Sequence, residues 1–141
     1  MYYGKGTEEG ILTNLYTVIN VISGIGFVDW QRIEDTGIDS TKYPGVFINS
    51  VRTDKERKLQ DIVKNKLSIA LVCWVWAATG ENLGSKIHTF ANVVRDAVAA
   101  DPTRNNNARN TVIESITTDG GSRFPQGMFI MPLLITYYSE K

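Results

Sequence analysis

The chain has 141 residues, 43% of them hydrophobic, and its 15 Lys or Arg balance its 15 Asp or Glu to give a formal net charge of zero. This size fits one domain, residues 1–141, with its own core, and the hydrophobic content excludes a disordered chain. The balanced charge argues against a general nucleic-acid binder, and the single cysteine, Cys73, excludes an internal disulfide or a cysteine-rich metal site.

The sequence has no membrane or export signal of the usual kind. Its longest apolar run, Ile69–Ala78, is about half of the ~20 residues that cross a bilayer. The N-terminus has no apolar stretch after a basic start, as a signal peptide would. We therefore expect a soluble protein without a membrane partner.

The first predicted element is a helix from Glu8 to about Ser23. Thr7 is a favourable N-cap, and Glu8 and Glu9 suit the positive end of the helix dipole. Gly24 follows in the position that commonly ends a helix. Apolar residues recur at helical spacing: Ile11, Leu12, Leu15, Val18, Ile19 and Ile22.

Two strands and a loop should follow. Ile25–Ile33 alternates as a strand, with Val28 and Trp30 on one side, and the polar stretch Glu34–Tyr43 is typical of a loop. After Pro44-Gly45, the alternation of Val46–Thr53 predicts a second strand.

The segment Asp54–Lys66 fits two structures. Its apolar residues Leu59, Ile62 and Val63 suit a short helix, but they also suit a charged hairpin that leads into the next strand. We favour the hairpin, because the next strand begins without a turn signal.

The strand signal is strongest in Leu67–Ala77. Both of its faces are apolar, which is typical of a central strand covered on both sides, at least in an assembled state. Trp74 and Trp76 share one face. Because a single helix covers only part of such a face, part of it is a candidate subunit interface.

A second helix should begin after Gly80-Glu81-Asn82 and end at Asp101-Pro102, since a residue before proline disfavours the helical conformation. The polar loop Arg104–Asn110 separates it from two strands, Thr111–Thr118 and Met128–Tyr138. The apolar stripe of the helix is Leu83, Ile87, Phe90, Ala91, Val94 and Val98.

Pro132 lacks a donor N–H, which predicts an edge or a bulge in the last strand. The order of the elements predicts an α+β fold: a single mostly antiparallel or mixed β-sheet packed against two main helices.

No residue pattern predicts catalysis, a cofactor or a metal. His88 lacks an acidic or nucleophilic neighbour and is expected on a surface or interface, while Cys73 is expected to be a small buried hydrophobe. Gly24-Ile25-Gly26 follows a helix instead of a strand, which excludes a dinucleotide fingerprint. The acids around Asp29–Asp39 lack calcium-loop spacing and indicate a solvated loop.

Two polar segments are candidates for subunit or ring contacts. The mixed-charge run with Lys55, Arg57 and Lys58 is either an exposed turn or a rim that pairs with a neighbouring subunit. The loop with Arg104, Asn106 and Arg109 is either a flexible connection or a loop that lines a ring lumen or contacts the next ring. Two arginines among amides are too few to predict nucleic-acid binding.

The order and spacing of four features resemble tail terminator (tail-completion) proteins of long-tailed bacteriophages, over roughly residues 9–138. The first is an opening helix followed by a short strand, and the second is the proline-led strand at Tyr43–Ile48. The third is the long strand Leu67–Ala77, followed by the helix that ends in Ala99-Ala100-Asp101-Pro102-Thr103. The fourth is the final pair of strands, Val112–Thr118 and Gly127–Tyr138, with Phe124-Pro125-Gln126-Gly127 leading into the second of them.

The resemblance implies a non-enzymatic virion protein, assembled in the host cytoplasm. It would form a hexameric ring that caps the tail tube, stops its polymerisation and joins the tail to the head connector. The implied partners are further copies of the chain, the tail tube protein, the connector or neck protein, and a sheath protein if the tail is contractile. DNA would pass through the lumen without specific binding.

Two alternatives stay open. One is another head–tail neck or tail-tube component. The other is a small ligand-binding or enzyme domain, which a concave pocket with two or more convergent polar side chains would indicate.

Overall fold

The computed structural model describes residues 7–30, 43–57, 62–78, 80–120 and 124–140. The elements in these residues are, in chain order, α1 (Glu8–Asn20), β1 (Phe27–Trp30), β2 (Gly45–Arg57), β3 (Ile62–Trp76), α2 (Leu83–Ala99), β4 (Asn110–Ile113), β5 (Thr117–Thr118) and β6 (Gln126–Glu140).

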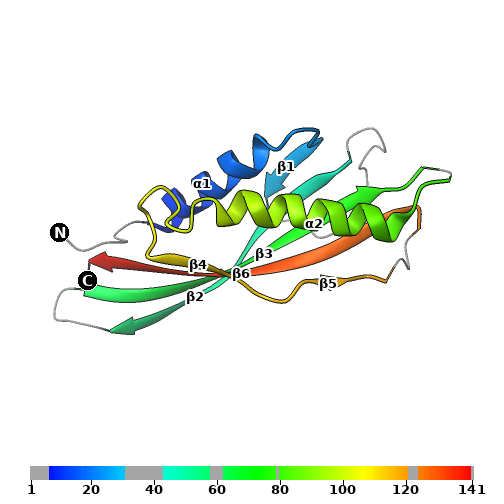
Figure 1. The fold of residues 1–141 in the computed structure, drawn as a ribbon. Coiled ribbons are helices and arrows are strands. Elements are labelled where there is room, and N and C mark those ends of the chain that lie inside the picture. The colour runs from blue at the N-terminus through cyan, green and yellow to red at the C-terminus, as the bar shows by residue number, and fades with distance from the viewer. Residues whose placement is uncertain (1–6, 31–42, 58–61, 79, 121–123, 141) are drawn as a thin grey trace.

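The described strands form one six-stranded sheet in the order β1-β2-β3-β6-β4, with β5 also paired to β6. Only β1 and β2 pair in parallel, and the other pairs are antiparallel. Both described helices lie on one face of this sheet (Figure 1). The predicted α+β class, with a mixed sheet and two main helices, is confirmed.

Helix α1 begins where the sequence predicts and ends earlier. The Thr7 hydroxyl accepts a 3.0 Å hydrogen bond from the Gly10 amide, and Ile11, Leu15 and Ile19 are buried. The helix ends at Asn20 because the chain then enters a turn, in which the Ile22 amide donates to the Ile19 carbonyl. Gly24, with φ of +82°, lies in this turn. The predicted end near Ser23 is therefore wrong by about one helical turn.

The charged hairpin is confirmed. β2 and β3 pair from Gly45 opposite Trp74 to Arg57 opposite Val63, with one irregularity between Ser50 and Arg52. β1 begins at Phe27, two residues later than the predicted Ile25, and residues 31–33 at the predicted end lie outside the described residues. Residues 31–42, which contain most of the predicted loop, and residues 58–61 at the hairpin turn lie outside the described residues.

Strand β3 lies in the middle of the sheet, as its two apolar faces predicted. Leu67, Ile69, Leu71, Cys73 and Val75 face the helices and belong to the main core. The opposite face has a smaller cluster, in which Trp74 is 0% exposed and packs with Phe47 and Val72. Neither described helix covers the Trp74 face, because both lie on the other side of the sheet (Figure 1). Coverage of this face in an assembly stays a prediction.

Helix α2 matches the prediction closely. The Asn82 side chain accepts a 3.0 Å hydrogen bond from the Ser85 amide and caps the first turn, and the helix ends just before Asp101-Pro102. All six residues of the predicted apolar stripe are buried: Leu83, Ile87, Phe90, Ala91, Val94 and Val98.

The predicted strand Thr111–Thr118 is in fact two short strands, β4 and β5, and both pair with β6. The interruption lies opposite Pro132, whose carbonyl accepts a 2.9 Å hydrogen bond from the Glu114 amide. The amide and carbonyl of a strand residue point to the same side, so the donor that proline lacks would also face this interruption. β6 is thus an interior strand, so the edge alternative is wrong, and its register with β3 has no shift at Pro132 that would mark the alternative bulge. The proline lies where the neighbouring strand is broken.

Candidate functional site

The sheet face away from the helices carries a row of half-buried apolar side chains. Successive residues of a strand point to opposite faces, so the residues between the core-facing ones point to this side. Val112, at 46% exposure, lies at its margin opposite Leu134. We call this surface the open face, and it comprises Ala70, Met128, Ile130, Pro132, Leu134 and Val112. A surface of this kind commonly marks a protein–protein contact.

Toward the β2–β3 hairpin the same side of the sheet becomes charged. Asp54 lies opposite Lys66, and Glu56 opposite Lys64. Two ion pairs form there, Arg52–Asp54 at 3.2 Å and Lys66–Glu56 at 4.0 Å. Since the paired side chains are exposed, these ion pairs add little to the stability of the fold, and their charges stay available to another molecule.

The candidate contacts of the charged run lie at this hairpin. Lys55 is exposed near the end of β2, and Arg57 is the last residue of that strand. Lys58 lies outside the described residues. A contact role for these three residues stays a prediction.

The second candidate segment contains one clear correction. Arg104 is 0% exposed, and its Nη2 donates to the carbonyl oxygens of Val98 and Asp101 at the end of α2. Burial lowers the pKa of the Arg104 guanidinium, while nearby Asp101 raises it. Arg104 is therefore not available to line a lumen or to contact DNA in this conformation, whereas Asn106 and Arg109 are exposed.

Asp101 organises the loop around Arg104. Its carboxylate accepts hydrogen bonds from the Thr103 amide and hydroxyl, at 3.2 and 2.9 Å, and from the Asn105 amide at 2.6 Å. Burial raises the pKa of Asp101, but these hydrogen bonds outweigh that effect and hold the pKa below its ordinary value. Hydrogen bonds to its own side chains thus stabilise this loop, in which Arg104, Asn105 and Asn106 all have positive φ.

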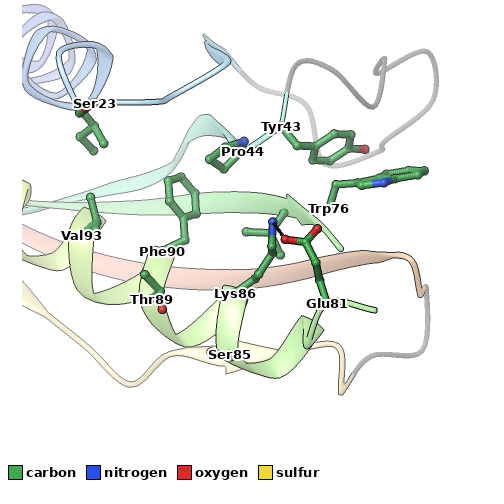
Figure 2. A pocket seen from close by; sticks show the side chains of 12 residues that line it. Ser23, Tyr43, Pro44, Trp76, Glu81, Ser85, Lys86, Thr89, Phe90 and Val93 are labelled. Atoms are coloured by element: carbon green, nitrogen blue, oxygen red, sulfur yellow. Dashed lines mark ion pairs between the residues drawn. The ribbon is translucent and has the colours of Figure 1, made fainter. Parts of the chain in front are cut away.

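A cavity of about 490 Å³ lies between the end of α1, the start of β2 and the first turns of α2 (Figure 2). Its walls include Tyr43, Trp76 and Phe90. At its rim Lys86 pairs with Glu81 at 2.8 Å, and this hydrogen bond lowers the pKa of the Glu81 carboxyl. The volume suits a small ligand, but the two charged groups are bonded to each other and not aimed together into the cavity.

A groove of about 580 Å³ runs between α2 and the segment that contains β5. Leu83, Ile87, Ala91 and Ile116 form its apolar part, and His88 and Arg95 lie along it on α2. We call it the α2–β5 groove. His88 is exposed, as expected for a surface residue, and sequence reasoning missed the groove because β5 is far from α2 along the chain.

Cys73 is fully buried among apolar residues, and burial raises the pKa of its thiol well above the ordinary value. This agrees with the predicted role of a small hydrophobe. Among the described residues, no group of three or more His, Cys, Asp or Glu side chains is placed to hold a metal ion. No helix in that part of the chain is long and apolar enough to cross a membrane.

Comparison with known proteins indicates neither a family nor a function for this chain. No family model matches the chain, and no curated protein matches it in sequence.

Proposed function

We propose that this chain is a virion structural protein, a tail terminator that forms a ring on the end of a phage tail tube. The ring, a hexamer by resemblance, stops tube polymerisation and presents a surface to the head connector. No enzymatic step is part of this function. The alternative within the same class is another neck or tail-tube component.

The observation that carries the proposal is the open face. The apolar side chains of Ala70, Ile130 and Leu134 stay only half-buried, because both described helices lie on the other face of the sheet. Burial against another protein would remove this apolar surface from water, at roughly 25 cal/mol per Å². An assembly protein needs a surface of this kind, whereas an enzyme needs convergent polar groups.

The order of the elements also supports the proposal. The helix–strand opening, the proline-led β2, the long β3 followed by α2, and the final strands keep the spacing on which the resemblance depends. The charged β2–β3 hairpin supplies groups of both signs, which set orientation at an interface more than affinity.

A second candidate is a small ligand-binding domain, and the cavity beside Trp76 and Phe90 favours it. It is the weaker candidate, because the charged groups at the cavity rim, Glu81 and Lys86, satisfy each other.

The test is the mass of the purified full chain and its negative-stain image, alone and with tail tubes. A six-fold ring, free or on tube ends, is the expected result. A monomer in solution that still caps tubes would mean that the tube templates the ring, and it would also support the proposal. A monomer that never caps tubes would overturn it.

A further inference from the structure

One flank of the molecule, formed by α1 and β1, is acidic and carries an exposed tryptophan. Residues 7–30 contain Glu8, Glu9 and Asp29 and no Lys, Arg or His. Trp30 is 41% exposed and lines a shallow depression of about 540 Å³ with Glu9 and the side of α1. We call this surface the acidic flank, and it comprises Glu8, Glu9, Leu12, Thr13, Asp29 and Trp30.

The exposed tryptophan is held in a defined position. Its ring stacks on Tyr16 of α1, with centroids 5.3 Å apart and planes 21° from parallel. Its amide donates a 2.8 Å hydrogen bond to the Asp29 carboxylate, which keeps that negative charge beside it. A large aromatic group that is already ordered loses little entropy on binding, and such groups often dominate interfaces.

The other flank has the complementary properties. The α2–β5 groove has an apolar floor that includes Ile87 and Ala91, and Arg95 and His88 lie along it. Arg95 is exposed, and its Nη1 donates a 3.3 Å hydrogen bond to Asn92, which also lines the groove. This groove can therefore receive an aromatic side chain flanked by carboxylates.

The two flanks lie at opposite edges of the sheet. β1 is the first strand in the sheet order, and β5 pairs with β6 on the far side of β3 (Figure 1). Two different, complementary patches on opposite sides allow identical copies to join head to tail, and such contacts form a ring when the rotation closes.

We propose that the acidic flank of one copy of this chain docks into the α2–β5 groove of the next copy. Trp30 enters the apolar part of the groove, and Glu9 and Asp29 face Arg95. The inference rests on the proposed ring and assigns its subunit contact to these surfaces, with a second copy of this chain as the partner.

Charge reversal on each flank tests this contact in the full chain. Glu9→Lys alters only the acidic flank, and Arg95→Glu alters only the groove. Both residues are exposed, so circular dichroism should stay native. Each variant alone should self-associate at least tenfold more weakly than the parent in sedimentation velocity or mass photometry.

The two variants mixed in equal amounts give the sharper result. The reversed flank of one then meets the reversed groove of the other, so alternating assemblies should recover the parent's mass. Asp96→Lys is the matched control, because Asp96 neighbours Arg95 on α2 but does not line the groove; it should leave association unchanged. The neutral variants Glu9→Gln and Arg95→Gln should show the same ranking with smaller losses.

The outcomes separate this inference from the proposed function. Parent rings that are unaffected by either reversal would overturn the contact and leave the tail terminator proposal standing. Copies that associate through this contact but never cap tubes would support the contact and overturn the tail terminator proposal. A parent that stays monomeric, with and without tubes, would overturn the inference that the partner is a second copy of this chain. So would an Arg95 that contacts only an unrelated acidic protein.

Discussion

The buried arginine holds the end of α2 to the loop that follows. Arg104 donates to the Val98 carbonyl, which lies in the last turn of α2 and has no partner within the helix. It also donates to the Asp101 carbonyl just beyond the helix, which accepts a 3.3 Å hydrogen bond from the Arg104 amide as well. Its Nε and Nη1 are buried and make no hydrogen bond within the described residues. The residue thus contributes through the helix end and through packing more than through a complete set of polar contacts.

Arg104→Ala should therefore lower the free energy of unfolding by roughly 2–4 kcal/mol, from the unsatisfied Val98 carbonyl and the cavity left behind. Urea denaturation followed by circular dichroism measures this change. Arg109→Ala, on an exposed residue of the same loop, should stay within about 0.5 kcal/mol of the parent. Equal effects of the two substitutions would contradict the role of Arg104.

Asp101 should make the stability of this loop depend on pH. Its pKa is below the ordinary value in the folded chain, so its contribution is present above the unfolded pKa of about 3.9 and is lost as the pH falls through the folded value. Between pH 7 and pH 3 the parent should lose more stability than Asp101→Asn, in urea midpoints taken at each pH. Thr103→Val, which removes one of the donors, should lie between them. Parallel profiles for the parent and Asp101→Asn would refute this.

At the scale of the elements, α2 can approach the sheet closely because Gly127 has no side chain. A Cβ at this position would lie 2.8 Å from the terminal Cδ1 atoms of both Ile87 and Leu83. The close contact between α2 and β6 thus depends on a residue that only the folded structure shows to be required.

Gly127→Ala should cost about 1–3 kcal/mol of unfolding free energy, because the helix or its side chains must move. Gly84→Ala is the matched control, at a glycine of α2 itself. There the nearest atom would be Asn82 Oδ1 at 3.4 Å, and the higher helix propensity of alanine should stabilise the chain by about 0.5–1 kcal/mol. Thermal and urea unfolding measure both variants, and a neutral Gly127→Ala would show that the interface adjusts freely.

Local signals were enough to predict several elements. The caps and apolar stripe of α2 act between residues three or four positions apart, so the sequence alone predicted its ends and its buried face. The β2–β3 hairpin was predicted for a similar reason, since its partners adjoin along the chain. The break between β4 and β5 was not predicted, because it depends on Pro132 in another strand.

At the scale of the whole molecule, the helices occupy one face of the sheet and leave the other for contacts. The main core lies between α1, α2 and the sheet, and the small cluster around Trp74 supports the opposite face. Under the proposed function, this asymmetry assigns the open face to the tail partner, and the proposed docking assigns the two flanks to contacts between copies.

Leu134→Glu should place a charge on the open face and abolish tube capping, because a carboxylate there would be desolvated by the partner. Leu134 is only half-buried, so the fold should persist with modest loss of stability. Val21→Glu, at a residue that is 75% exposed after α1, introduces the same charge away from that face and should leave capping intact. Negative-stain counts of capped tube ends measure both, and normal capping by natively folded Leu134→Glu would exclude this face from the tube contact.

The sequence by itself determined the fold class, both helices, the hairpin and the central position of β3, because periodicity, caps and turn residues act over short distances. Only the tertiary structure decided the parallel pairing of β1 with β2, the burial of Arg104, the open face and the α2–β5 groove. These depend on contacts such as that of Ser68 with Leu134, which join residues far apart in the chain. No local pattern encodes such contacts, since their free energy appears only when the whole sheet has formed.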